Sequence, residues 1–229
     1  MHFANLSGIV GAGTIVGTRA GGVAFSPYDS AMSTSHLLYL HGFRSSPLST
    51  KAQLVRQHVQ SRNPQLTFWC PQLPPSPKLA MQEVMAGIAG WPRERMAVIG
   101  SSLGGFYATW VAEQTGCRAA MLNPAVRPER DLARYIGELT SWHDPADRFY
   151  FRPDYVDELR ALQCGPITRP ERYYALIAKG DEVLDWREMV GRYPGAQIRL
   201  LEGSDHAISG FADYLDEVLA FVGLPGPAA

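Results

Sequence analysis

The sequence predicts an α/β fold, in which a mostly parallel, doubly wound sheet of about six strands carries helices on both faces. Three observations support this fold class. Short apolar runs bounded by Gly, Pro or Asn recur along the chain, which is typical of strands buried on both faces. Amphipathic stretches at helical spacing separate these runs. The two kinds of segment alternate, as they do when helices connect parallel strands.

The composition indicates an ordinary globular chain. Its 229 residues suffice for one well-buried core, and one domain is the default. The formal net charge of −1, without a basic block, argues against a nucleic-acid partner. No apolar run reaches membrane-spanning length. Cys70, Cys117 and Cys164 have no metal-binding spacing and predict thiols in a reducing compartment, the cytoplasm.

Residues 1–31 are rich in Gly, Ala and Ser and nearly free of charge. We expect them to be a disordered extension ahead of a domain at 32–225, with Met32 as a second candidate initiator. Their apolar stretch is interrupted by glycines and lacks a basic start, so no signal peptide is indicated. Residues 9–17 look like the start of a dinucleotide-binding turn, but no helix follows, which disfavours a bound dinucleotide.

The individual elements follow in order from Met32. The predicted strands occupy residues 37–41, 66–70, 96–100, 119–122, 173–178 and 197–201. The apolar stripes of the predicted helices lie within residues 48–59, 81–88, 103–111 and 211–222. Asn63-Pro64 stops the first of these helices, and Ser76 caps the second with Pro77 at its first position.

One interval, residues 123–172, interrupts this alternation, since it contains no convincing strand. Helical patterns occur in it near 129–138 and 154–163. Loops this long are usually functional, and this one follows the end of a strand where open α/β sheets bind ligands. We expect a small cap in which Phe149 and Phe151 line an apolar substrate pocket and Arg127 meets a polar or anionic leaving group. The alternatives are surface decoration, core packing of the aromatic side chains and a surface ion pair.

The most informative motif is Gly100-Ser101-Ser102-Leu103-Gly104, a G-x-S-x-G sequence between a predicted strand and a predicted helix. This is the context of a nucleophile elbow. The glycines permit a sharp turn, and the following helix aims free N–H groups at the reacting centre. The motif therefore predicts Ser102 as a nucleophile, against the alternative of a Gly-rich turn with an idle serine.

A nucleophilic serine needs a base and an orienting carboxylate, here in the chain order Ser, acid, His. His206, the histidine that follows the last strand, is the predicted base. Asp181, at the exit of the strand before it, is the predicted acid. Three other carboxylates fit less well: Asp185, which with Glu188 forms a capping-box pattern, Glu182, and Asp205, which adjoins the histidine too closely.

The oxyanion hole should combine the N–H of Leu103, which follows the nucleophile, with an N–H from the loop after the first strand. Phe43 supplies that second N–H in our interpretation. His41, in the same loop, precedes the nucleophile in the chain, and we expect it to shape the loop and not to act as the base.

These segments together resemble the YqiA-like esterase family of the α/β-hydrolase superfamily. The motifs that carry the resemblance are residues 38–43, Ser45-Ser46-Pro47, Pro71-Gln72-Leu73-Pro74, residues 100–105, residues 123–128, residues 180–185 and His206-Ala207. The resemblance covers about residues 37–224 and departs most beyond Arg127 and in residues 1–31.

The resemblance implies a serine esterase that acts on small carboxylic esters or thioesters without a cofactor or metal, and it assigns Ser102, Asp181 and His206 as catalytic residues. Because a fold does not fix a substrate, two alternatives stay open. One is another hydrolase activity, on peptide, C–C or C–N bonds. The other is a non-enzymatic binding protein on a hydrolase scaffold. The acyl chain, the leaving group and the oligomeric state stay undetermined.

Overall fold

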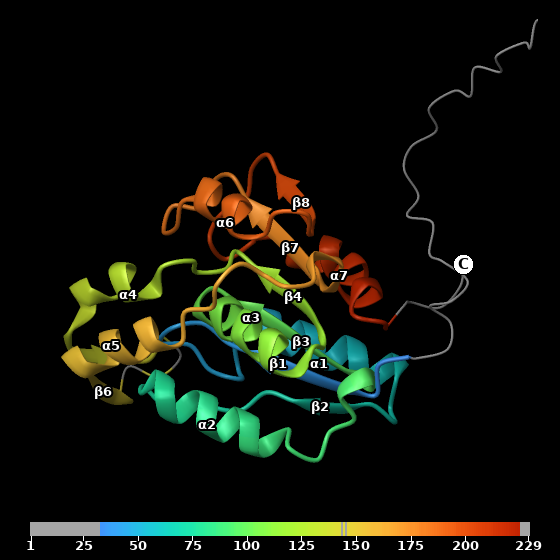
Figure 1. Ribbon diagram of the computed structural model, residues 1–229, viewed down its shortest axis with the longest axis horizontal. Coiled ribbons are helices and arrows are strands. Elements are labelled where there is room, and N and C mark those ends of the chain that lie inside the picture. Colours follow the sequence, from blue (N-terminus) through green and yellow to red (C-terminus); the bar gives the residue numbers. More distant parts are fainter. Residues whose placement is uncertain (1–32, 143, 145, 225–229) are drawn as a thin grey trace, which may run out of the picture. The chain divides into compact units, whose positions relative to one another are not determined.

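The computed structural model describes residues 33–142, 144 and 146–224, which belong to the compact unit Met32–Ala229 (Figure 1). The predicted disordered extension at 1–31, its dinucleotide-like turn and the candidate initiator Met32 lie outside the described residues. Among the described helices, none combines the length and the apolar character needed to cross a lipid bilayer.

A six-stranded parallel sheet in the order β2-β1-β3-β4-β7-β8 forms the centre of this unit. Its strands are β1 (His36–Leu40), β2 (Thr67–Trp69), β3 (Met96–Ser101), β4 (Arg118–Leu122), β7 (Tyr173–Ala178) and β8 (Gln197–Leu201). The four central strands are almost wholly buried, which explains why their sequences are continuous apolar runs. The predicted strands and the predicted fold class are confirmed.

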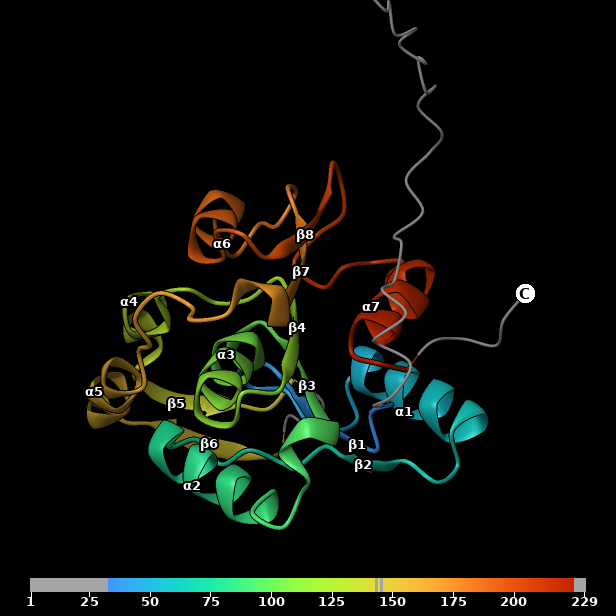
Figure 2. The same ribbon diagram turned by 45° about the vertical axis from the view of Figure 1, so that its right-hand side comes forward.

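Helices cover both faces of the sheet (Figure 2). On one face, α1 (Thr50–Arg62) and α7 (Leu215–Phe221), with the short helix η5 (Phe211–Tyr214), share a core with Leu37 and Tyr39 of β1, and α7 contacts β4 and β7. On the other face, α2 (Pro77–Gly87), α3 (Leu103–Thr115) and α6 (Trp186–Arg192) share a core with Leu38 and Leu40 of β1, where α3 contacts β1 and α6 contacts β7. Successive side chains of one strand thus serve two separate cores, as the pleat of a strand requires. The remaining short helices, η2 (Arg93–Arg95) and η4 (Pro170–Arg172), each lead directly into a strand.

The predicted caps are observed in two helices. Ser76 accepts a hydrogen bond from the N–H of Leu79 at 3.2 Å, and Pro77 occupies the first position of α2. Asn63 ends α1. The apolar stripe predicted from Leu48 begins too early, because α1 starts at Thr50 and leaves the Leu48 side chain exposed.

The interval 123–172 contains a β-hairpin that the sequence did not predict. It consists of β5 (Gly137–Thr140) and β6 (Arg148–Phe151), paired antiparallel. The helix predicted over 129–138 is wrong, since the chain forms only the short helices α4 (Pro128–Asp131) and η3 (Ala133–Tyr135) before it extends into β5. The second predicted helix is confirmed as α5 (Pro153–Ala161), which packs against α2 and α4.

Candidate active site

Ser102 occupies the sharp turn between β3 and α3. Its backbone has φ 56° and ψ −120°, a conformation that costs a non-glycine residue roughly 1–3 kcal/mol and is typical of functional sites. The turn is fixed by the Ser102 N–H, which donates to Leu122 O at 3.0 Å, and by Ser102 O, which accepts from Ala125 N at 3.0 Å. Only glycine fits at position 104, since a Cβ there would lie 2.0 Å from Leu40 O. The sequence therefore holds the serine side chain at the carboxyl end of the sheet.

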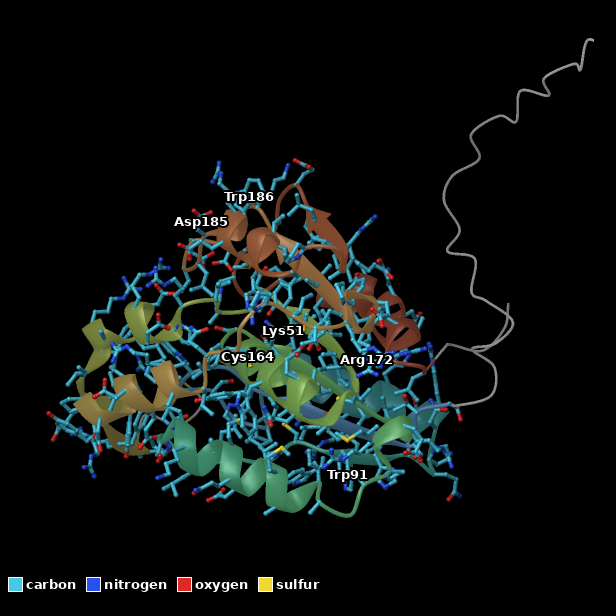
Figure 3. The ribbon with its side chains drawn as sticks, in the orientation of Figure 1. Lys51, Trp91, Cys164, Arg172, Asp185 and Trp186 are labelled. Atoms are coloured by element: carbon cyan, nitrogen blue, oxygen red, sulfur yellow. The ribbon has the colours of Figure 1, made fainter. Side chains whose placement is uncertain are left out.

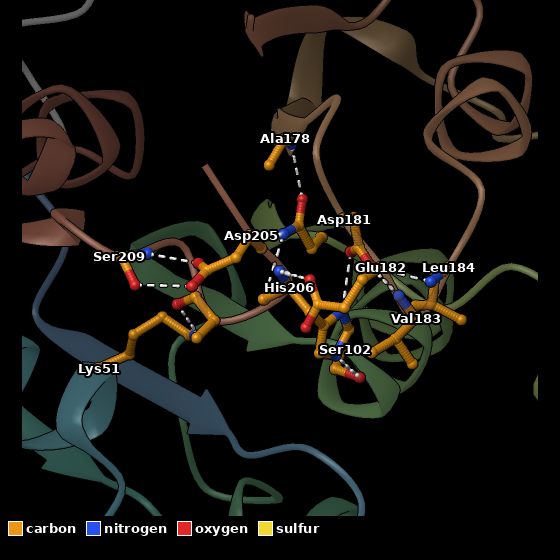
Figure 4. Close-up of polar contacts among 12 residues, drawn as sticks. Lys51, Ser102, Ala178, Asp181, Glu182, Val183, Leu184, Asp205, His206 and Ser209 are labelled. Atoms are coloured by element: carbon orange, nitrogen blue, oxygen red, sulfur yellow. Dashed lines mark hydrogen bonds and ion pairs between the residues drawn. The ribbon is translucent and has the colours of Figure 1, made fainter. Parts of the chain in front are cut away.

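His206 connects Ser102 with Asp181 through two hydrogen bonds (Figure 4). The distance from His206 Nδ1 to Asp181 Oδ2 is 2.7 Å, and that from His206 Nε2 to Ser102 Oγ is 3.0 Å. Because a carboxylate only accepts, Nδ1 carries the hydrogen and Nε2 is left to accept from the serine hydroxyl. The structure thus brings the three predicted residues together in the predicted order.

The carboxylate of Asp181 is completely buried, with 0% of its side chain exposed. Its Oδ1 accepts hydrogen bonds from the N–H groups of Val183 and Leu184, both at 2.8 Å. These two bonds leave Oδ2 for His206. A buried carboxylate that is fixed by two backbone N–H groups can hold an imidazole in one orientation and one tautomer.

The rejected carboxylates have other partners. Glu182 Oε2 accepts from the backbone N–H of His206 at 3.0 Å, so it holds the loop of the base and not its imidazole. Asp205 accepts from both N and Oγ of Ser209 at 2.7 Å, and these hydrogen bonds lower the pKa of its carboxyl. Asp185 lies at the start of α6 beside Trp186 (Figure 3), where it caps the helix by accepting from Arg187 N at 2.9 Å.

Asn123 is a positioning residue that sequence reasoning missed. It is completely buried, has φ 41°, and follows β4 directly. Its Oδ1 accepts from Ala178 N at 2.8 Å, and its Nδ2 donates to the carbonyls of Asp205 and His206 at 3.0 and 3.1 Å. One side chain therefore ties the ends of β4 and β7 to the loop that carries His206. The sequence feature that could have identified Asn123 is its position, since it is a polar residue directly after an apolar strand.

The loop after β1 passes directly against Ser102. A Cβ on Gly42 would lie 3.2 Å from Ser102 Cβ, so this loop requires glycine for its close approach. His41 is buried, accepts from Leu73 N at Nε2 over 3.1 Å and contacts Gly42 O through Nδ1 at 3.0 Å. These contacts join its own loop to the segment around Leu73, which supports the predicted role of His41 in shaping the loop.

Two hollows meet at Ser102, and Phe43, Trp142 and His206 line both of them. The first, the apolar hollow, has a volume of about 350 Å³. Its other lining residues are Arg44, Leu103, Ala125, Pro128, Asp131, Leu132, Arg134, Tyr135, Val183 and Leu184. The larger hollow, of about 520 Å³, extends toward α1 and includes Thr50 and Lys51. Phe43 and Leu103, the predicted oxyanion donors, thus both face the space beside the nucleophile.

The three residues predicted to bind substrate do not line either hollow. Arg127 lies in a separate hollow and donates from Nε to Glu129 Oε1 at 3.4 Å. Phe149 and Phe151 pack edge-on against the ring of Phe43, at centroid distances of 6.3 and 5.2 Å, and Phe151 is buried. The aromatic pair therefore supports the oxyanion loop from behind. Direct contact of these three side chains with a substrate stays a prediction.

Arg44 attaches the oxyanion loop to the hairpin of the insertion. Its backbone has φ 57°, and its carbonyl accepts from Trp142 N at 2.8 Å. The Arg44 guanidinium lies 4.0 Å from the ring centroid of Trp142 and donates from Nε to Thr140 O at 2.7 Å. The insertion thus contacts the loop next to Phe43, which the sequence did not indicate.

The three cysteines are buried or half-buried. Burial raises the pKa of the Cys117 thiol to about 11, so it is protonated at neutral pH. Cys70 is likewise buried, and Cys164 is half-buried (Figure 3). No group of three His, Cys, Asp or Glu side chains within the described ranges is placed to hold a metal ion.

Comparisons with known proteins agree with this architecture. A family model described as "Uncharacterised protein family (UPF0227)" matches residues 36–223. Alpha/beta hydrolase domain-containing protein 10 from mouse is similar in structure, with a TM-score of 0.62 at 16% identity over 82% of this chain and 91% of that one. Est1E from Butyrivibrio proteoclasticus has a TM-score of 0.62 at 15% identity, over 85% and 89%. A metagenome-derived structure reported under the names LipS and LipT, lipolytic enzymes, has a TM-score of 0.59 at 19% identity, over 83% and 94%. These likenesses show the α/β-hydrolase fold.

Proposed function

The chain belongs to the YqiA-like protein family UPF0227, as its motifs predicted, and we propose that it is a serine hydrolase that cleaves carboxylic esters or thioesters. The observation that carries the proposal is the pair of hydrogen bonds that links Asp181, His206 and Ser102. Nucleophilic catalysis by serine requires an oriented imidazole within hydrogen-bond distance of the hydroxyl, and this geometry supplies it.

In the first step, His206 Nε2 removes the proton from Ser102 Oγ while Oγ attacks the substrate carbonyl. The buried carboxylate of Asp181 stabilises the imidazolium that forms. Negative charge develops on the carbonyl oxygen, and the N–H groups of Phe43 and Leu103 receive it. Each such donor typically stabilises the transition state by about 3–4 kcal/mol.

In the second step, the imidazolium of His206 gives its proton to the departing alcohol or thiol, which leaves an acyl group on Ser102. A water molecule then enters, and His206 removes its proton as the oxygen attacks the acyl carbonyl. Expulsion of Ser102 Oγ, reprotonated by His206, releases the acid. None of these reaction steps requires a cofactor.

Esters and thioesters are the first substrates to test. One of the similar structures is named for lipolytic enzymes, and a further structure, of Est1E, is described with bound ferulic acid. Their identity to this chain is below 20%, so they suggest a bond type and no particular acyl group. A panel of acyl esters, acyl thioesters and peptide amides therefore separates the proposed activity from its hydrolase alternatives.

Labelling with a fluorescent alkyl phosphonate tests whether the serine is reactive at all. The wild-type chain should be labelled, and Ser102→Ala should lose both labelling and ester hydrolysis while it keeps its fold by circular dichroism. Ser101→Ala, one residue away, is the matched control and should keep its labelling. A wild-type chain that folds but resists the phosphonate would favour a binding protein on a hydrolase scaffold. Equal loss in both variants would contradict the assignment of Ser102.

A further inference from the structure

We propose that the substrate carries an anionic group, a carboxylate or a phosphate, which binds Arg44 and Arg134 in the apolar hollow beside Ser102. This inference rests on the proposed function of Ser102 and adds the class of substrate. It assigns to these two arginines the role that the sequence suggested for Arg127.

The two arginines reach the hollow from different parts of the chain. Arg44 follows the loop after β1, and Arg134 lies in η3 of the insertion. Both line the apolar hollow together with Ser102 and His206. Two arginines therefore line the hollow that Ser102 also lines, in a wall that is otherwise largely apolar.

Neither guanidinium forms an ion pair within residues 33–142, 144 and 146–224. Arg44 donates from Nε and Nη2 to Thr140 O and Oγ1, which are neutral acceptors. Asp131, the acidic residue in the lining of the hollow, already accepts from Arg130 Nε at 2.8 Å. The charges of Arg44 and Arg134 are thus left without a carboxylate partner.

Most other arginines of the insertion pair with a carboxylate. Five of them do so within the segment: Arg127 with Glu129, Arg130 with Asp131, Arg152 with Asp154, Arg160 with Asp157 and Arg169 with Glu171. Arg130 also makes a bidentate contact with Glu188 on α6, with both distances 2.7 Å. Arg134 at the hollow has no such partner, and Arg148, which likewise has none among the described residues, is exposed and lies away from the hollow.

Aromatic rings hold both guanidinium groups in place. Arg44 lies 4.0 Å from the ring centroid of Trp142, and Arg134 lies 5.0 Å from that of Tyr135. The ring of Tyr135 in turn lies 5.7 Å from the ring of Phe43. A ring contact restrains a guanidinium without using its N–H donors. Arg134 therefore keeps all its donors, and Arg44 keeps those of Nη1 beside the two it gives to Thr140, for the oxygens of a carboxylate or a phosphate.

The rest of the hollow fits a hydrocarbon segment. Leu103, Leu132, Val183 and Leu184 line it, and its volume of about 350 Å³ falls within the roughly 300–1,000 Å³ of small-molecule sites. A substrate that fills it would place its reacting carbonyl at Ser102, its apolar part against these side chains and its charge at the arginines. The anionic group can belong to the acyl part or to the leaving group.

Two matched substrate pairs distinguish these sources. The acyl pair is the para-nitrophenyl monoester of suberic acid, which is anionic, and para-nitrophenyl octanoate, which is neutral. The leaving-group pair is para-butyryloxybenzoate and para-butyryloxybenzamide. The wild-type chain should have the higher kcat/KM for the anionic member of one pair, and added salt should weaken that preference.

Arg134→Gln is the decisive variant, because the Arg134 side chain makes no hydrogen bond to the described chain that its loss would disturb. It should lower kcat/KM for the preferred anionic ester about tenfold and change that for the neutral ester less than about twofold. Arg134→Glu should lower kcat/KM for the anionic ester further, because it replaces a positive by a negative charge. Arg148→Gln is the control, since Arg148 lies in β6 of the same insertion, is exposed and lines neither hollow at Ser102.

The outcomes separate this inference from the proposed function. Hydrolysis without an anion preference in either pair, or equal effects of the Arg134 and Arg148 variants, would overturn the inference and leave the serine hydrolase standing. Absence of phosphonate labelling would contradict the hydrolase itself. In that case, calorimetric binding of the suberate monoester to Ser102→Ala, with and without Arg134→Gln, still tests the anion site. Equal affinity of the two proteins would overturn it.

Discussion

The side-chain amide of Asn123 donates to the backbone carbonyl of His206 over 3.1 Å, while its oxygen accepts the N–H of Ala178 at the end of β7. This buried residue thereby fixes the loop of the proposed base relative to the sheet that carries the proposed nucleophile. In the described part of the chain, Asn123 forms no hydrogen bond with the side chains of Ser102, Asp181 and His206, and we expect their geometry to depend on it.

Replacement of Asn123 should therefore reduce turnover more than substrate binding. Asn123→Ala leaves the N–H of Ala178 and two carbonyls without their partner, which should lower the free energy of unfolding by about 1–3 kcal/mol. We expect kcat to fall about 10- to 100-fold with a smaller change in KM, because small misplacements of a catalytic group cost that much. Steady-state kinetics with any hydrolysed ester measures both constants.

Two further variants separate positioning from stability. Asn123→Asp keeps an acceptor for Ala178 N but cannot donate to the carbonyls of Asp205 and His206, so its kcat should also fall. Val55→Ala, in the core between α1 and the sheet, should lose comparable stability and keep its kcat. An Asn123→Ala protein with the wild-type kcat would show that the loop holds its place without this amide.

Asp181→Asn should damage catalysis far more than Asp185→Asn. The first change removes the charge that orients and stabilises the imidazole of His206, which in serine hydrolases costs about 10⁴-fold in kcat. The second replaces the cap of α6 by a residue that caps almost equally well. Comparison of kcat for the two proteins shows which aspartate orients His206. A larger loss of kcat in Asp185→Asn would place the orienting acid at the start of α6.

The apolar hollow should determine the length of the acyl chain. Leu132→Phe narrows it and should shift the preference toward shorter acyl groups, since one methylene in an apolar pocket contributes about 1–3 kcal/mol. Leu132→Ala should shift it toward longer ones. Relative kcat/KM values across a series of para-nitrophenyl esters provide the measurement.

Phe149→Ala is the comparison for this series, because that side chain packs behind Phe43 and does not line the apolar hollow. It should change the rate for all chain lengths in the same proportion. A selective shift with Phe149→Ala, and none with the Leu132 variants, would move the acyl site to the neighbouring hollow that Phe149 lines.

The close packing of α3 on the sheet predicts a stability effect. A Cβ at position 104 would lie 2.0 Å from Leu40 O. Because that oxygen belongs to the backbone of β1, it cannot move away from the clash as a flexible side chain could. Gly104→Ala should therefore lower the free energy of unfolding by about 3 kcal/mol or more. Gly90→Ala, where no atom lies within 4 Å of the new Cβ, should stay within about 1 kcal/mol of the wild type in urea unfolding. Similar stability of both variants would contradict the tight contact between α3 and β1.

Local sequence patterns were sufficient to predict the strands of the sheet and the order of the candidate catalytic residues along the chain. The central strands are largely apolar runs, and Ser102 and Asp181 follow two of them directly or by a few residues. His206 follows the edge strand β8, whose sequence alternates polar and apolar residues before it ends in Leu200-Leu201. Their meeting point then follows from the topology, because parallel strands end at one edge of the sheet.

The insertion could not be predicted in the same way. Strands β5 and β6 have only four residues each, and only one of their eight residues is buried, so they lack the continuous apolar run of the central strands. The contacts of Arg44 with Thr140 and of Asn123 with the His206 loop join segments that are distant in sequence. The same holds for the apolar hollow, whose walls include Leu132 and Val183 from separate loops.

The central claim is that Ser102 carries the acyl group during hydrolysis. Rapid acid quenching of the enzyme during turnover of a para-nitrophenyl ester, followed by peptide mass spectrometry, tests it most directly. The account predicts at most one acyl group per chain, on Ser102, and its absence from Ser102→Ala. An acyl group found on another residue, or sustained ester hydrolysis by Ser102→Ala at the wild-type rate, would contradict it.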